Sequence, residues 1–306
     1  MQNAIIAMDK SGSYRVYLAV TTDMVREACQ IHETSPTASA GLGRVLTAAG
    51  LMGIMLKGEK DKLTIQFKGD GPAQEILATG LANGVVKGYI ANPDVDLPLN
   101  AQGKLDVGGS LGIGTLTVIK NLGLKEPYVG RIDLVNGEIA EDLTTYFFLS
   151  EQQNSAVVLG VKVAQDTTVA ASAGMIIQML PDAKPESIDA LEAMLSEMRP
   201  FSTLVEENPT PEALMEAVFG KMPEEYKPEI LEHRDIIWKC DCKMERLEQV
   251  MLTLGEEELT RLLEEDGQAE LTCHFCRSTY LFDKPHLEML IRVAKRVQDY
   301  KDGKGL

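Results

Sequence analysis

The chain has 306 residues, 44% of them hydrophobic, a length that accommodates about two domains with cores of ordinary size. Its formal net charge of −16 argues against a nucleic-acid partner, because a phosphate backbone repels an acidic surface. Five cysteines are too few for a secreted disulfide scaffold, no run of about 18 apolar residues is present, and the N-terminal residues show no signal-peptide pattern. We therefore expect a cytoplasmic protein with no membrane partner.

The negative charge is concentrated in the C-terminal part of the chain. Residues 1–180 carry 18 acidic and 14 basic side chains, whereas residues 181–306 carry 28 and 16. We expect an α+β fold in three parts: an N-terminal domain of sheet and helices at 1–180, a helical acidic linker at 181–232, and a small zinc-binding domain at 233–306.

Residues 1–180 predict one sheet packed against helices. Apolar runs at 4–8 and 14–20 predict a hairpin, Thr22 is expected to cap a helix reaching Glu33, and Ser35-Pro36 to start a second helix reaching Lys57. This second helix is rich in Ala and Gly, so we expect it to be central and buried. Asp70-Gly-Pro predicts a short helix and 141–153 a longer one, and further strands are expected at 62–68, 85–91, 115–119, 128–134, 157–163 and 169–179.

Three features of this domain resemble functional sites but have simpler interpretations. Gly108–Gly114 resembles a phosphate loop, yet a strand pattern comes directly after it where a helix is required, which favours a bulged glycine turn. Cys29 falls in a helical pattern and is expected to be a core residue, and Arg44 is expected to form a structural ion pair. His32 is the only histidine in this half, so no acid–base constellation is present and we expect no enzymatic activity.

Seven prolines and an excess of acidic residues distinguish the middle stretch, residues 181–232. Short amphipathic segments at 188–198 and 214–219 lie between them, with Pro185 and Pro211 suited to the first turn of a helix. Helices of about three turns are marginal alone, so these are expected to persist only while docked. We interpret the stretch as a metastable connector; an ordinary helical linker fits the composition equally well.

Residues 233–306 predict a small domain with a thin core. Helices are expected at 243–254, 256–266 and 285–300, and a hairpin at 269–272 and 279–282. About seventy residues with few large aromatic side chains need a further source of stability, such as a structural metal.

Four cysteines in this last part have the spacing of a thiolate zinc site. Cys240 and Cys242 form one pair and Cys273 and Cys276 the other, with thirty residues between the pairs. Two short pairs separated by a helix-length spacer are typical of a tetrahedral site that binds one Zn²⁺. His274, which lies between the cysteines of the second pair, could substitute as a ligand, but it is expected to point outward.

Several classes of zinc or thiol site are less compatible with this pattern. A catalytic zinc needs an open position, a nucleic-acid-binding ribbon is usually basic, and a thioredoxin-type motif lies at a strand–helix junction. A purely structural zinc remains open. A disulfide between Cys240 and Cys242 would close a small strained ring, and strained disulfides are labile and regulatory. This favours a switch in which oxidation releases the metal and exposes hydrophobic surface.

The chain resembles a known family, the bacterial redox-regulated 33 kDa heat-shock chaperonins, over nearly its whole length. The resemblance rests on Gly41-Leu-Gly-Arg44, Phe67-Lys-Gly-Asp-Gly-Pro72, Gly109-Ser-Leu-Gly112, Val129-Gly-Arg131-Ile132, Tyr146-Phe-Phe-Leu-Ser-Glu-Gln152 and the four-cysteine pattern. The cysteine pattern is the specific part, since the glycine motifs alone are weak.

The resemblance implies an ATP-independent holdase for stress conditions, idle while reduced and zinc-bound. It further implies that oxidation forms the disulfides Cys240–Cys242 and Cys273–Cys276, that the linker and zinc domain then become disordered, and that the monomer dimerises and binds unfolded client proteins. Met194, Met198 and Met215 then become candidate client or regulatory surfaces. A zinc-dependent regulatory adaptor with one specific partner and a thiol oxidoreductase remain as alternatives.

Overall fold

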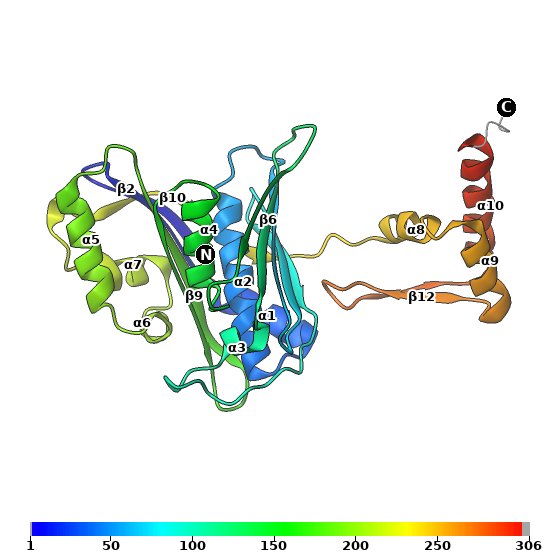
Figure 1. Ribbon diagram of the computed structural model, residues 1–306, viewed down its shortest axis with the longest axis horizontal. Helices are drawn as coiled ribbons and strands as arrows, with labels where there is room; N and C mark the ends of the chain where they lie inside the picture. Colours follow the sequence, from blue (N-terminus) through cyan, green and yellow to red (C-terminus); the bar gives the residue numbers. More distant parts are fainter. Residues whose placement is uncertain (1, 302–306) are drawn as a thin grey trace. The chain divides into compact units, whose positions relative to one another are not determined.

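The computed structural model describes residues 2–301 and resolves two compact units, one ending at Lys239 and the other beginning at Cys240 (Figure 1). The α+β class expected from the sequence is confirmed, with helices and sheets in both units.

The first unit contains two sheets instead of the single sheet expected. The first sheet is antiparallel and has five strands in the order β10 (Pro228–Arg234), β1 (Ala4–Asp9), β2 (Tyr14–Val20), β9 (Val169–Met179) and β8 (Ser155–Val163). The second has six, in the order β11 (Ile237–Trp238), β5 (Val85–Ile90), β4 (Glu75–Leu81), β3 (Lys62–Gly69), β6 (Gly114–Asn121) and β7 (Tyr128–Asp133). Sequence periodicity predicts strands but not the sheet to which each belongs, and so the single-sheet expectation was wrong.

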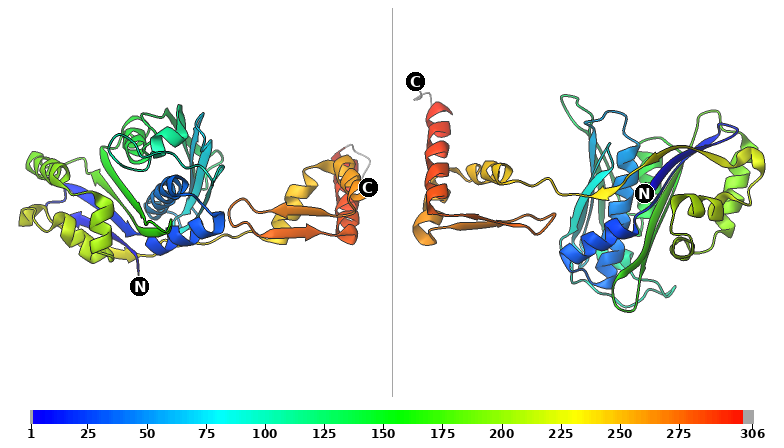
Figure 2. Two further views of the ribbon diagram at one scale, coloured as in Figure 1. Left: turned by 90° about the horizontal axis from the view of Figure 1, so that it is seen from below. Right: turned by 180° about the vertical axis from the view of Figure 1, so that it is seen from behind.

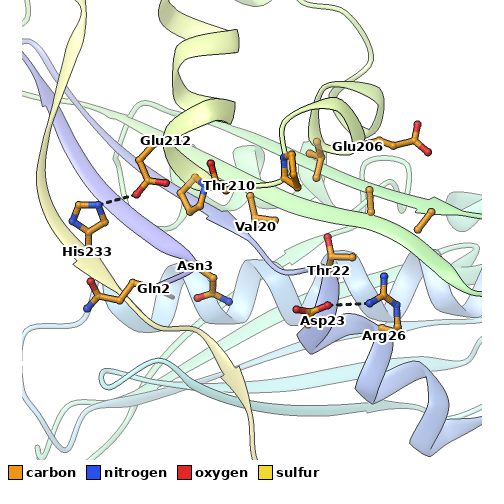
Figure 3. A pocket seen from close by; sticks show the side chains of 15 residues that line it. Gln2, Asn3, Val20, Thr22, Asp23, Arg26, Glu206, Thr210, Glu212 and His233 are labelled. Carbon is orange, nitrogen blue, oxygen red and sulfur yellow. Dashed lines mark hydrogen bonds and ion pairs between the residues drawn. The ribbon is translucent and has the colours of Figure 1, made fainter.

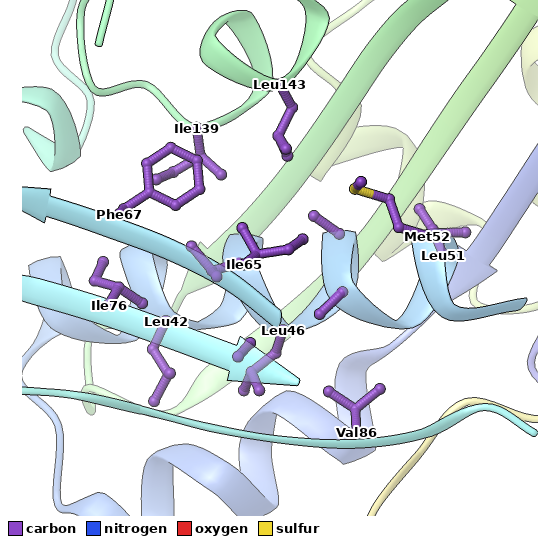
Figure 4. Packing of buried hydrophobic residues seen from close by; sticks show 14 of the residues in the cluster. Leu42, Leu46, Leu51, Met52, Ile65, Phe67, Ile76, Val86, Ile139 and Leu143 are labelled. Carbon is purple, nitrogen blue, oxygen red and sulfur yellow. The ribbon is translucent and has the colours of Figure 1, made fainter. Parts of the chain in front are cut away.

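Helix α2 (Pro36–Ile54) packs against both sheets and forms the centre of the unit. Its residues contact β4 and β5 of the second sheet and β8 and β9 of the first, and all of them except Pro36 and Arg44 are buried. A helix that is apolar all round must be covered on every side. Figure 4 shows its Leu42 and Leu46 among the side chains of β3 and β4. The prediction of a central buried helix that starts at Ser35-Pro36 is confirmed, and the Ser35 hydroxyl caps it by accepting the amide of Ala38; the helix ends at Ile54, before the predicted Lys57.

Some local predictions were wrong. Thr22 does not cap α1 (Thr22–His32); it is the first helical residue, and its hydroxyl bonds to Ser172. The Asp70-Gly-Pro segment forms a turn and leads into strand β4, because Ile76, Ala78 and Gly80 alternate inward with the period of a strand. The glycine-rich segment forms a five-residue helix, α3 (Val107–Leu111), instead of a bulged turn, and β6 begins soon after it.

Three helices cover the face of the first sheet that is opposite α2 (Figures 1 and 2). They are α5 (Pro185–Glu197), α6 (Phe201–Glu207) and α7 (Pro211–Phe219), followed by a short 3-10 turn at Glu224–Tyr226. Pro185 and Pro211 occupy the predicted first-turn positions. The helices bury Leu191, Leu214 and Phe219 against a continuous apolar face that β1, β2 and β9 supply. A fourth helix, α4 (Ala140–Leu149), packs against β8.

Residues 228–239, which we call the strap, run from one sheet to the other. The strand β10 forms the edge of the first sheet beside β1, and β11 forms the edge of the second sheet beside β5. The second compact unit therefore begins at Cys240, seven residues later than the zinc-binding domain expected from the sequence, because residues 233–239 complete both sheets of the first unit.

The second unit consists of α8 (Met244–Leu252), α9 (Gly255–Glu265), the hairpin β12 (Ala269–Thr272) and β13 (Thr279–Phe282), and α10 (Lys284–Lys301). Its buried apolar side chains within the described residues are few: Met251, Leu259, Phe282, Leu287, Leu290 and Ala294. The predicted helices, hairpin and thin core are all confirmed.

Candidate metal centre

The hairpin of the second unit holds one pair of cysteines and the segment before α8 holds the other. Cys273 and Cys276 lie in the turn between β12 and β13, which is closed by hydrogen bonds from the Cys273 amide to the Ser278 carbonyl (2.9 Å) and from the Arg277 amide to the Cys273 carbonyl (2.8 Å). Arg277 adopts a positive φ of 59°, which turns the chain back toward β13. Cys240 and Cys242 lie in the extended segment that leads into α8.

The fold brings all four sulfurs together. Their Sγ atoms lie within 4.8 Å of one another, with Cys240 3.8 Å from Cys273 and Cys242 3.2 Å from Cys276. A tetrahedral zinc with Zn–S bonds of about 2.3 Å needs sulfurs about 3.8 Å apart. All five cysteines of the chain are free thiols, and the four in this cluster fit a metal ion. A bound ion would tie the hairpin to the segment before α8.

Two further side chains, which sequence reasoning did not identify, contact the sulfurs. The Tyr280 hydroxyl lies 3.2 Å from the Cys242 sulfur, and the Ser278 hydroxyl lies 3.2 Å from that of Cys276. Hydroxyl groups in this position can stabilise thiolates and orient metal ligands. The only sequence signal for them is their place on the hairpin that carries the second cysteine pair.

The ionisation of the thiols differs across the cluster. Burial raises the pKa of Cys240 and of Cys242. Burial also opposes ionisation of Cys276, but hydrogen bonds with the hydroxyl and amide of Ser278 and with the Cys242 and Cys240 thiols together outweigh it and lower the pKa of that thiol to about 7. The hydrogen bond to Cys242 is the main reason that the pKa of Tyr280 rises to about 12. Because metal ligands must be thiolates, metal binding here has to displace protons.

Other candidates from the sequence lie outside this cluster. His274 is exposed. Within residues 2–301, the four cysteines form the one group of three or more Cys, His, Asp or Glu side chains that could hold a metal ion. Cys29 is buried in the first unit, as predicted, where burial raises the pKa of its thiol. Arg44 forms the expected ion pair, with its guanidinium 2.7 Å from Glu138.

Trp238 belongs to the first unit although it lies two residues before Cys240. Its side chain is 8% exposed and packs edge-on against the His32 ring, with the ring centroids 6.2 Å apart. Its closeness to Cys240 in the chain would by itself predict a reporter of the metal site. Its surroundings make it instead a reporter of strap docking.

The chain is similar to known proteins over almost its entire length. The family model described as Hsp33 protein matches residues 3–283. The chain is 46% identical over 292 residues to the 33 kDa chaperonin of Alkaliphilus oremlandii, which covers 95% of this chain and 96% of that protein. It is also 46% identical over 291 residues to the 33 kDa chaperonin of Bacillus subtilis, with 95% and 98% covered.

A solved structure is also similar in fold to this chain. The crystal structure of the 33 kDa chaperonin from Thermotoga maritima superposes with a TM-score of 0.85 at 34% identity and covers 96% of this chain and 99% of that one. Within residues 2–301, no helix is both long and apolar enough to span a bilayer. The chain therefore belongs to the Hsp33 family of chaperonins and is a chaperone, a protein that binds client proteins.

Proposed function

We propose that the protein is an ATP-independent holdase that is idle while its four cysteines hold one zinc ion and that oxidation activates. In the reduced state Cys240, Cys242, Cys273 and Cys276 bind the metal. The observation that carries the proposal is that these four sulfurs converge in a unit with a very small apolar core, directly after the strap. Bound zinc of this type contributes on the order of 10 kcal/mol to folding, so the unit depends on it.

Oxidation removes the ligands. Each pair, Cys240–Cys242 and Cys273–Cys276, gives up two electrons to an oxidant such as peroxide, which takes up protons and leaves as water while the disulfide forms. Four thiolates are consumed and the zinc ion is released. The second unit then loses the metal that stabilises its fold.

The connector, residues 181–232, covers the surface that clients would need. Helices α5 to α7 bury Ile5, Leu18 and Met175 of the first sheet, and Met194 and Met198 lie at the edge of the same cluster. These helices are short and strongly acidic, and their stability comes from docking. Their release would expose a continuous apolar face, and large exposed apolar patches mark sites that bind other proteins.

The remaining parts of the proposal depend on the same switch. We propose a cytoplasmic protein that is a monomer when reduced and a homodimer when oxidised, since an uncovered apolar face favours association. It binds unfolded clients without catalysing a reaction. A thiol oxidoreductase is less well supported, because Cys273 and Cys276 lie in a hairpin turn and not at the start of a helix.

Light scattering of an aggregating client tests the proposal. The oxidised, zinc-free protein should suppress scattering without nucleotide, and the reduced, zinc-loaded protein should not. Zinc stoichiometry before and after peroxide should fall from one toward zero in parallel. Equal suppression in both states would exclude the switch, and reduction of insulin disulfides by the protein would favour the oxidoreductase.

A further inference from the structure

Strand β1 is an unprotected sheet edge once the strap leaves it. Its residues Ala4–Met8 are all apolar, and a charge appears only at Asp9. Natural edge strands carry charges, prolines or bulges that block pairing with other chains. Strand β7, the exposed edge of the second sheet, obeys this rule with Arg131 and Asp133. Strand β1 has no such residue before Asp9 and is covered by β10 instead.

The strap pairs with β1 mainly through its backbone. The register places Met8 opposite Glu229, Ile6 opposite Glu232 and Ala4 opposite Arg234, with a bulge after Ile230. Most β10 side chains are exposed, so this part of the strap buries little apolar area against β1. An extended segment with apolar side chains at alternate positions would bury more on the same edge.

The direction of the β1 amides can be read from two hydrogen bonds. The Lys10 amide donates to the Lys227 carbonyl on the strap side, whereas the Asn3 carbonyl accepts the Val20 amide on the β2 side. Backbone amide and carbonyl groups alternate in direction along a strand, so those of the even-numbered β1 residues point toward β10. The amide and carbonyl groups of their partners Glu229, Glu232 and Arg234 point toward β1.

The strap is fastened at a few points. The Asn3 side chain binds both backbone groups of Ile236, donating to its carbonyl and accepting its amide, each at 2.8 Å. His233 of β10 pairs with Glu212 at the start of α7, 2.9 Å away, beside a cavity of about 670 Å³ (Figure 3). Release of α7 therefore removes one fastening of the strap.

We propose that the β1 edge binds extended apolar segments of unfolded clients by strand addition and that the strap is the internal strand that occupies this edge in the idle state. The inference rests on the proposed function, because the strap must first leave. It adds that clients are bound through backbone hydrogen bonds as well as by the apolar face on which Ile5 and Ala7 lie. Backbone pairing is independent of side-chain sequence, which suits a binder of many clients.

Labelled peptides that copy residues 227–239 test the pairing with the full-length protein. We expect fluorescence anisotropy to show binding to the oxidised protein and none to the reduced protein, whose own strap is docked. N-methylation at Glu229, Glu232 and Arg234 removes three hydrogen bonds at about fivefold each, so affinity should fall about 100-fold. N-methylation at Ile230 and His233, whose amides point away from β1, should change it about twofold at most. Similar losses in both peptides, or no binding to the oxidised protein, would overturn the inference.

A variant of β1 gives a second test. Met8→Pro removes an amide on the strap side, whereas Met8→Ala removes the side chain and keeps the amide. After oxidation, Met8→Pro should lose at least about ten times more aggregation suppression than Met8→Ala. A model in which clients use only the apolar face predicts no loss specific to Met8→Pro, since oxidation has already released the strap.

The two proposals fail in different ways. If the oxidised wild-type protein does not suppress aggregation, the redox switch itself is wrong. If the wild type suppresses aggregation and Met8→Pro does so equally well, only strand addition is wrong. Circular dichroism of the reduced variant shows whether Met8→Pro folds, and if it does not, the peptide result decides.

Discussion

The Ile236→Ala substitution should release the strap in the reduced protein. The Ile236 side chain is fully buried, and it packs so closely against α2 that a Cβ added at Gly50 would lie 2.4 Å from its Cγ2 atom. Truncation of a buried isoleucine costs about 2–5 kcal/mol, and a rigid neighbouring helix limits collapse of the cavity. Because the strap is an edge segment, this loss of stabilising free energy should raise the equilibrium constant for local opening of the strap by about 30-fold to several thousandfold.

Ile237→Ala is the matched control. Ile237 is 46% exposed, so its truncation should change stability by less than about 0.5 kcal/mol. Hydrogen exchange of the amides at 228–239, measured on reduced, zinc-loaded protein, should accelerate in Ile236→Ala and remain unchanged in Ile237→Ala. Aggregation suppression by the reduced protein should rise in the first variant alone. Equal effects at both positions, or faster exchange throughout β2 and β9, would refute local release of the strap.

Three further results are expected. Cys273→Ser should lower zinc stoichiometry and accelerate hydrogen exchange within 240–301 alone. The control variant Cys29→Ser should still bind zinc. If the zinc-free Cys273→Ser protein kept its exchange protection, a folding role for the metal would be contradicted. Phe219→Ala, 2% exposed in the wild type, should loosen the connector by about 3–5 kcal/mol and activate the reduced chaperone, whereas Phe148→Ala, 61% exposed, should not. Trp238 emission should shift red when exchange at 228–239 accelerates; an emission shift on zinc loss with a protected strap would contradict its placement.

Much of the local structure could be predicted because local patterns encode it. The alternation at 62–68 identified β3, Ser35-Pro36 marked the start of α2, and the helical pattern at 285–300 identified α10. Residues 70–81 were misread, because Gly and Pro mark a turn but do not specify whether a helix or a strand comes after it. The strands of the strap were not predicted, because the polar strand β10 has no apolar alternation.

The sequence by itself indicated a cluster of four thiols that could hold a metal ion, and the class of fold. Cysteine spacing is local along the chain, so two short pairs on either side of a helical spacer indicate a thiolate cluster before the fold is known. The tertiary structure decided what the connector covers, which strand lies beside β1, and that Trp238 packs on His32. These are pairings between residues far apart in the chain, and no local pattern specifies them, because a strand edge or an apolar face accepts any partner that the rest of the fold brings to it.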